Sequence, residues 1–205
     1  MELRNYQSDL VNDITQSILR GTKRIMVQSP PRSGKTVVMA HIAKGATDKG
    51  NTVLFFSHRK EINEQVVNTF KRNDVDMNLV TIDSVTKVAR NLDRISEPSI
   101  ILIDEAHHVK AKTYLKIIEH FSNSVVLMFT GTPARLDGSG FDDIADDIVL
   151  GKSVKWLQEN GNIAPFKYYA PSLIDTTNLK KRGGEFTKKA VDDTMKRVIY
   201  GDVIR

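Results

Sequence analysis

The stretch Arg24–Thr36, RIMVQSPPRSGKT, decides the fold of this 205-residue chain. Its first five residues form an apolar run that predicts a buried strand, and residues 36–46 are apolar on most sides, which is typical of a deeply packed helix. The loop between them ends in Gly34, Lys35 and Thr36. A tight loop at a helix N-terminus presents backbone N–H groups and positive potential to a phosphate. The sequence therefore predicts a phosphate-binding loop between a strand and a helix.

The side chains of this loop suit a nucleoside triphosphate. Lys35 would reach the β- and γ-phosphates, and the Thr36 hydroxyl would bind Mg²⁺. The usual pattern G-x-x-x-x-G-K-[ST] begins with glycine where this chain has Ser29, so the alternative is a solvated turn that happens to contain Gly-Lys-Thr. The strand before the loop and the helix after it favour the phosphate loop. Its predicted nucleotide-binding residues are Pro31, Arg32, Ser33, Gly34, Lys35 and Thr36.

Strand and helix patterns alternate along the first 130 residues. Apolar runs rich in β-branched residues predict strands at 24–28, 52–56, 78–82, 99–104 and 124–129. These runs are nearly continuous rather than alternating, which is typical of strands buried on both faces of a parallel sheet. Apolar residues at helical spacing separate them, and the pattern predicts a doubly wound α/β domain. A further strand is predicted at 166–170, and a polar helix near 187–200.

Two carboxylates end the fourth of these strands, at Asp104 and Glu105. The carboxyl ends of parallel strands line the ligand crevice, so we expect Asp104 to lie beside the phosphate loop. Asp104 would hold Mg²⁺, and Glu105 would orient or deprotonate an attacking water. The alternative is that both residues only cap the next helix. Zinc at His107 and His108 is disfavoured, because the chain has neither cysteine nor an i,i+4 histidine pair.

Composition excludes several classes of protein. The chain has no cysteine, which rules out a disulfide framework, and no apolar run of the about 20 residues that a membrane span needs. Residues 1–150 carry 19 basic and 19 acidic side chains, whereas residues 151–205 carry 11 and 6. The net charge of +5 therefore belongs to the C-terminal quarter and is only a mild indication of a nucleic-acid partner. The acidic segment 142–147 is interpreted as a solvated face, and Trp156 as a packing residue.

These motifs resemble the first RecA-like domain of DEAH-box superfamily-two helicases, in the branch of excision-repair, restriction-motor and phage helicases. Asp104-Glu105-Ala106-His107 is similar to the family's DEAH motif, and the phosphate loop resembles the family's own loop, where the first glycine is often alanine. Five further segments match family motifs in order: Leu3–Gln7, Val53–Gln65, Val80–Ser84, Phe129–Arg135 and Trp156–Pro165. Two departures stand out, Arg32 in place of a common glycine and Gly131 in place of alanine.

The resemblance implies a three-layer RecA-like fold with a mostly parallel central sheet flanked by helices, and ATP and Mg²⁺ as cofactors. It also implies residue roles beyond the phosphate loop. Arg4 and Gln7 would recognise adenine, and Arg59 and Ser84 would contact nucleic acid. His107, Thr130, Thr132 and Arg135 would couple the nucleotide state to the nucleic-acid groove. Taken alone, Arg59 has a simpler interpretation as part of a solvated strand-to-helix turn, and Thr130 and Thr132 as capping residues.

The expected organisation is a RecA-like domain at 1–172. Residues 173–205 are expected to form a linker, which includes Lys180–Gly184, and the truncated start of the next region. The family's second RecA-like domain, which would complete the groove, does not fit in the remaining chain. We expect an ATP-dependent nucleic-acid motor, on DNA rather than RNA, that hydrolyses slowly as this piece. A cytoplasmic location, in a bacterium or a phage-infected host, is expected. A small-molecule phosphotransferase and a non-catalytic nucleotide-gated loader remain the alternatives.

Overall fold

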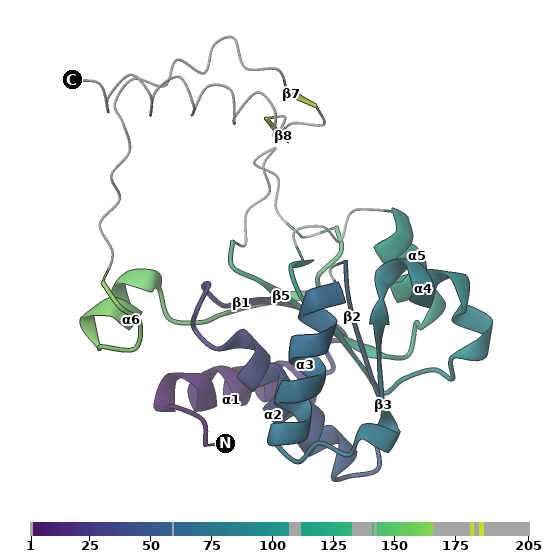
Figure 1. Cartoon of the computed structure of the whole chain (residues 1–205), viewed down its shortest axis with the longest axis horizontal. Coiled ribbons are helices and arrows are strands. Elements are labelled where there is room, and N and C mark those ends of the chain that lie inside the picture. The colour runs from purple at the N-terminus through teal and green to yellow at the C-terminus, as the bar shows by residue number, and fades with distance from the viewer. Residues whose placement is uncertain are drawn as a thin grey trace. The chain divides into compact units, whose positions relative to one another are not determined.

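The computed structural model describes residues 2–58, 60–106, 112–132, 141, 143–165, 181–182 and 185–186. Six strands form one parallel sheet in the described part of the chain, in the order β3-β2-β4-β5-β1-β6 (Figure 1). The strands are β1 (Arg24–Gln28), β2 (Val53–Ser57), β3 (Val80–Ser84), β4 (Ile100–Ile103), β5 (Val125–Thr130) and β6 (Asp147–Leu150). The predicted α/β class is confirmed, and the described sheet is wholly parallel.

Helices cover both faces of the sheet and make three layers (Figure 1). One face carries α1 (Asn5–Leu19), α2 (Lys35–Thr47) and α3 (Lys60–Arg72), and the other carries α4 (Val85–Arg90) and α5 (Lys112–His120). Neighbouring strand residues alternate between the two cores: Val27 and Phe55 pack on the α1–α3 side, and Met26 and Phe56 on the α4–α5 side. Because both faces are buried, the strands read as continuous apolar runs.

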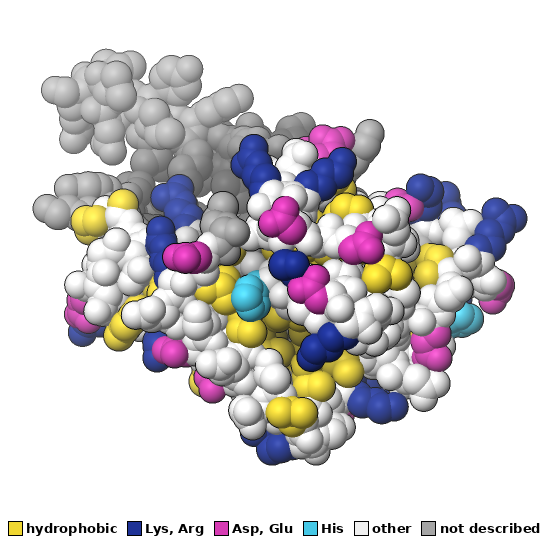
Figure 2. Space-filling view, turned by 90° about the horizontal axis from the view of Figure 1, so that it is seen from below, with side chains coloured by type: hydrophobic (Ala, Val, Ile, Leu, Met, Phe, Trp, Pro, Cys, Tyr) yellow, Lys and Arg dark blue, Asp and Glu magenta, His cyan; other side chains and the backbone are white. Residues whose placement is uncertain are grey.

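Charges of both signs mix on the outer face of α1 and α2. Figure 2 shows lysine and arginine interspersed with aspartate and glutamate there, around hydrophobic side chains at the bottom of a hollow. Two adjoining cavities of about 640 and 370 Å³ lie on this face, and Val11 and His41 border both. The mixture of charges agrees with the neutral balance of residues 1–150 and gives this face no electrostatic preference for a polyanion.

The bounds of predicted strands shift by one or two residues, and short elements that were not predicted are present. The strand predicted at 78–82 begins two residues later, because the Asp76 carboxylate accepts a hydrogen bond from the Asn78 N–H and starts the 3₁₀ turn η1 (Met77–Leu79). A second 3₁₀ turn, η2 (Leu92–Arg94), follows α4, and a short helix, α6 (Val154–Glu159), follows β6. The strand predicted at 124–129 starts and ends one residue later.

The strand β6 was not predicted, because it begins inside the acidic segment interpreted as a solvated face. That interpretation was wrong for Asp147, which accepts hydrogen bonds from the Ser17 hydroxyl and the Arg20 guanidinium, 3.0 Å away, both on α1. The Ser17 hydrogen bond, with those from Ile148 and Arg20, lowers the pKa of the Asp147 carboxyl. Val149 is buried against α1. Long-range contacts therefore make this strand, and a local pattern does not reveal it.

The chain divides into two compact units, residues 1–135 with 139–164, and residues 136–138 with 165–205. In the second unit, β7 (Lys181–Arg182) pairs antiparallel with β8 (Glu185–Phe186). Both lie in the region predicted as a linker, with Lys180–Gly184 in it, and the start of the next region, and that assignment stays a prediction. The strand predicted at 166–170, the helix predicted near 187–200 and the predicted domain boundary at 172 lie outside the described residues. Among the described helices, none has both the length and the apolar character of a membrane span.

Candidate nucleotide-binding site

The loop between β1 and α2 has the backbone of a phosphate cradle. Gly34 precedes the first residue of α2 with φ +84°, and Arg32 has φ +65°. Both angles lie in the left-handed region, where glycine is favoured and an L side chain is strained. Arg32 therefore adopts a backbone conformation that suits the glycine common at this position in the helicases that the chain resembles. Its side chain is exposed, as is that of Pro31, whereas Ser33 is buried.

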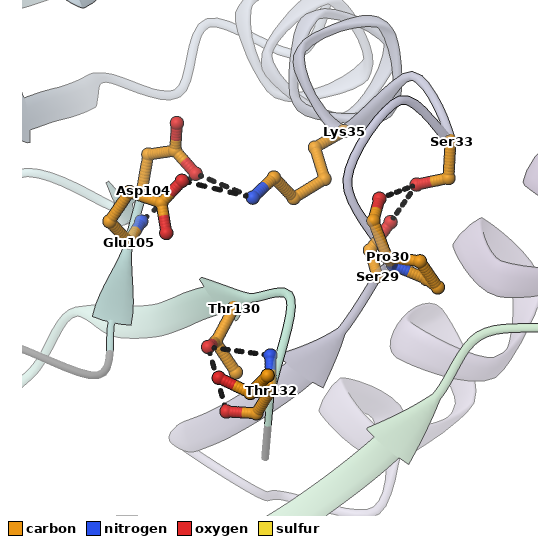
Figure 3. A network of polar contacts seen from close by, with 8 residues as sticks. All are labelled: Ser29, Pro30, Ser33, Lys35, Asp104, Glu105, Thr130 and Thr132. Carbon is orange, nitrogen blue, oxygen red and sulfur yellow. Dashed lines mark hydrogen bonds and ion pairs between the residues drawn. The ribbon is translucent and has the colours of Figure 1, made fainter. Parts of the chain in front are cut away.

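Two residues of α1 anchor this loop. The Ser33 carbonyl accepts hydrogen bonds from the Tyr6 hydroxyl (2.8 Å) and from Gln7 Nε2 (3.0 Å), both in buried positions. The Ser33 hydroxyl donates to the Pro30 carbonyl (2.6 Å) and lies 2.7 Å from the Ser29 hydroxyl (Figure 3). Because the Ser33 carbonyl is held toward α1, the loop has little freedom to turn its carbonyls toward a bound phosphate.

The predicted adenine-recognition residues lie beside this anchor. Gln7 Oε1 accepts a hydrogen bond from the Arg4 N–H (3.0 Å), and the Arg4 guanidinium donates to the Asn162 carbonyl (3.0 Å). Trp156 packs edge-on against Tyr6, with 6.1 Å between ring centroids, which confirms its interpretation as a packing residue. The hydrogen bond to the Ser33 carbonyl places Gln7 at the phosphate loop, and Arg4 lies beside Gln7, while recognition of a base by them stays a prediction.

The acidic end of β4 meets the loop. Lys35 Nζ lies 3.5 Å from Asp104 Oδ1 and 3.4 Å from Glu105 Oε1 (Figure 3). The side chains of Lys35 and Asp104 are only 13% and 10% exposed, and that of Glu105 is 32% exposed. Glu105 has φ +52°, and its N–H donates to Asp104 Oδ1 (2.9 Å). The convergence of Lys35 with Asp104, expected from parallel-sheet topology, is present.

The predicted coupling residues at the end of β5 touch the loop as well. The Thr130 hydroxyl donates to the Thr132 carbonyl (2.9 Å) and accepts from the Thr132 N–H (3.2 Å). The Thr130 carbonyl accepts a hydrogen bond from the Ser29 N–H (2.8 Å). A Cβ at Gly131 would lie 3.1 Å from Pro31 Cδ. Alanine at position 131 would therefore press on the loop, which gives a physical reason for the glycine.

The remaining predicted residues divide into placed and undescribed ones. Thr36 lies in the first turn of α2, and Ser84 ends β3, where its N–H donates to Asp83 Oδ1 (2.8 Å). Arg59, His107 and Arg135 lie outside the described residues. No group of three or more histidines and carboxylates that would hold a metal occurs in the part of the chain that the structure describes.

Sequence reasoning missed two tyrosines at this site. Tyr6 is the neighbour of Gln7, and only its place in that segment pointed to it. Tyr114 of α5 is buried, and its hydroxyl has no hydrogen-bond partner in the described part of the chain. Burial, followed by the negative charge of Asp104, raises the pKa of the Tyr114 hydroxyl. No signal in the sequence marks this residue, because a tyrosine on the apolar face of a helix reads as core.

Comparison with known proteins agrees with this geometry. Residues 1–80 and 71–135 match the family model described as "Type III restriction enzyme, res subunit". A 51.5 kDa protein of a Lactococcus phage is 43% identical over 180 residues, which cover 88% of this chain and 40% of the phage protein. The IRC3 protein of Saccharomyces cerevisiae, whose name describes an ATP-dependent helicase, is 26% identical over 98% of this chain and 34% of its own length.

Solved structures show the same fold. The restriction-modification enzyme LlaGI, solved with a DNA substrate mimic, matches 78% of this chain and 21% of its own with a TM-score of 0.63 at 14% identity. The UvsW helicase of bacteriophage T4 matches 73% of this chain and 60% of its own with a TM-score of 0.61 at 15% identity. The chain thus spans two fifths or less of the curated relatives named above. It belongs to the family of the Type III restriction enzyme res subunit and carries the N-terminal RecA-like domain of a superfamily-two helicase.

Proposed function

We propose that this chain is the ATP-binding part of a DNA-dependent motor, which hydrolyses Mg²⁺-ATP and couples hydrolysis to movement along nucleic acid in a longer protein. The observation that carries the proposal is the meeting of Lys35 with Asp104 and Glu105 at 3.4–3.5 Å. A cation held between two carboxylates at a phosphate loop is the arrangement that a metal–triphosphate complex can enter. Lys35 would bind the phosphate oxygens of such a complex, and Asp104 would be a ligand of its Mg²⁺.

Each residue then has a separate task. Lys35 binds the phosphates, and Thr36 and Asp104 hold the Mg²⁺, which when bound neutralises charge on the phosphate oxygens. Glu105 aligns and deprotonates the attacking water. Its side chain is three times as exposed as that of Asp104, which suits a group that must reach a water molecule. Thr130 and Thr132, joined to the loop through Ser29, relay the state of the nucleotide toward the nucleic-acid groove.

The longer protein supplies what this chain does not. We propose that a second RecA-like domain provides the arginine finger, whose absence lowers turnover by about 10³–10⁵-fold in comparable nucleotide hydrolases. The chain alone is therefore expected to bind ATP and ADP but to hydrolyse slowly and to unwind nothing. DNA is favoured over RNA because one structural relative was solved with a DNA substrate mimic. A cytoplasmic location belongs to the same proposal, and the phage relative supports it.

A binding and turnover experiment tests the proposal. Lys35→Ala is expected to weaken binding of a fluorescent ADP analogue at least tenfold (about 1.4 kcal/mol). Lys44→Ala is the matched control, because it removes the same charge from α2 at an exposed pair with Asp48. In the longer protein, Glu105→Gln is expected to bind ATP normally and to lose DNA-stimulated hydrolysis. Normal hydrolysis by Glu105→Gln would exclude Glu105 as the base, and phosphorylation of a metabolite without stimulation by DNA would favour the phosphotransferase.

A further inference from the structure

The short helix α6 and the turn after it hold the start of α1. The Trp156 ring meets the Tyr6 ring edge-on, with 6.1 Å between ring centroids. The carbonyl of Asn162 accepts a hydrogen bond from the Arg4 guanidinium at 3.0 Å, and these two residues are 158 positions apart in the sequence. The segment that is predicted to recognise adenine is therefore held from outside by a part of the chain that follows β6.

Local hydrogen bonds fix the position of the Asn162 carbonyl. Ser153 caps the N-terminus of α6, where its hydroxyl accepts a hydrogen bond from the Trp156 N–H (3.1 Å). At the other end the chain turns back at Gly161, which has φ +67°, and the Asn162 N–H donates to the Leu157 carbonyl (2.8 Å). A left-handed residue just after a helix is a common way to end it. This turn therefore determines where the carbonyl that meets Arg4 points.

The segment that contains α6 is also fixed to the strand that leads into the phosphate loop. The Gly151 N–H donates to the carbonyl of Gln28, the last residue of β1, at 2.8 Å. Leu157 is fully buried, and a cavity of only about 10 Å³ remains where it borders Leu10 and Ser33. The segment therefore packs on both α1 and the phosphate loop, with little room to shift relative to either.

Arg4 is the residue that gains most from this support. Its side chain is exposed, and a long side chain loses many rotamers when it is immobilised. The hydrogen bond to the Asn162 carbonyl selects one arrangement in advance. A guanidinium is planar and stacks on the face of an aromatic ring, which is what a nucleotide base offers. Ordering one such side chain before binding strengthens binding by about threefold to tenfold.

We infer that α6 and the turn after it set the choice of base at the nucleotide site. Trp156 and Asn162 are positioning residues: they act through Tyr6 and Arg4, and they fix the start of α1 in the geometry that accepts adenine. The inference rests on the proposed function and deepens it, because it assigns the preference for adenine to a segment outside the phosphate loop and outside the carboxylates of β4.

Binding of fluorescent ADP and GDP analogues to this chain tests the inference, because the two share their phosphates and differ in the base. Trp156→Ala removes the ring from Tyr6, and Gly161→Val strains the left-handed turn before Asn162. Each is expected to lower the preference for ADP over GDP by about threefold to tenfold. The matched conservative variants are expected to keep the preference, because Trp156→Phe retains a ring and Gly161→Asn tolerates the left-handed backbone.

Leu92→Ala is the control for lost packing, because Leu92 is buried in the core on the other face of the sheet. It is expected to lower the urea midpoint and to leave the preference for ADP unchanged. An unchanged preference in both Trp156→Ala and Gly161→Val overturns the inference, and so does equal weakening of ADP and GDP, since α6 would then act through the fold. If Trp156→Ala does not fold, Gly161→Val decides, because Gly161 is exposed and has open space for a side chain.

The unmodified chain separates failure of this inference from failure of the proposed function. If it binds neither ADP nor GDP, the proposed function fails and the inference falls with it. If it binds both equally, the proposed nucleotide site stands and the inference alone is overturned.

Discussion

The carbonyl of Ser33 offers a quantitative test of how the phosphate loop is held. It receives one hydrogen bond from the Tyr6 hydroxyl and one from Gln7 Nε2. Tyr6→Phe removes the first donor and keeps the ring against Trp156. Gln7→Met removes the second donor and also the acceptor of the Arg4 N–H, in a side chain of similar length. Only the double variant leaves the Ser33 carbonyl without either donor.

The single variants and the double variant should therefore differ in whether the Ser33 carbonyl keeps a hydrogen-bond donor. A typical hydrogen bond contributes about 1 kcal/mol, so we expect losses of about 1 kcal/mol for Tyr6→Phe and about 2 kcal/mol for Gln7→Met. In both, one donor still satisfies the carbonyl. Because Ser33 is only 3% exposed in the unmodified chain, its carbonyl would be buried without a donor in the double variant, which adds a further cost of about 1–3 kcal/mol. The double variant should thus be less stable than the sum of the single variants by that amount.

Urea unfolding of the four proteins measures this coupling free energy. The control pairs Tyr6→Phe with Thr47→Val, which removes the hydrogen bond from the Thr47 hydroxyl to the Lys44 carbonyl at the far end of α2. Changes at distant sites usually add to within about 0.5 kcal/mol. Additivity of that quality for Tyr6 and Gln7 would refute the reasoning, because it would mean that the Ser33 carbonyl does not depend on these two donors.

Three further predictions concern other positions. Gly34→Ala should destabilise by more than Gly21→Ala. Both glycines have positive φ, +84° and +89°, and share a strain of about 1–2 kcal/mol, but only at Gly34 would the new Cβ clash with Gln7 Nε2; urea midpoints measure the difference. Gly45→Ala should raise the free energy of unfolding by about 0.5–1 kcal/mol, because this position is inside α2 and has open space for a Cβ. Thermal unfolding measures the change, and a loss of stability would contradict the prediction. Asp147→Asn should lower stability by about 1–2 kcal/mol at neutral pH. The folded-state pKa of Asp147 lies below the ordinary value of 3.8, so the stability that its carboxylate contributes is complete above that value and is lost as the pH falls through the folded-state pKa. Urea unfolding between about pH 6 and pH 3 should therefore show the stability difference between Asp147→Asn and the unmodified chain shrinking. A constant difference would contradict the assignment.

Most of the site was predictable because its residues follow apolar strands. The runs that end at Gln28 and Ile103 predicted strands, and in a parallel sheet their carboxyl ends share one edge. Lys35 and Asp104 could therefore be expected to meet although they are far apart in sequence. The strand β6 could not be predicted, because it is short and starts with aspartate, and its burial comes from α1.

The sequence by itself determined the class of the fold, the phosphate loop with Lys35, and the carboxylates that face it, because strand periodicity and the Gly-Lys-Thr segment are local properties of the chain. Only the tertiary structure decided what holds these groups in place: Tyr6 and Gln7 on the Ser33 carbonyl, and Gly131 against Pro31. Each of these contacts joins residues at least 26 positions apart, and partners at such separations are chosen by the packing of helices on the sheet. The physical reason is that a local pattern specifies which face of an element is buried, whereas the identity of the neighbour depends on how all the elements pack together.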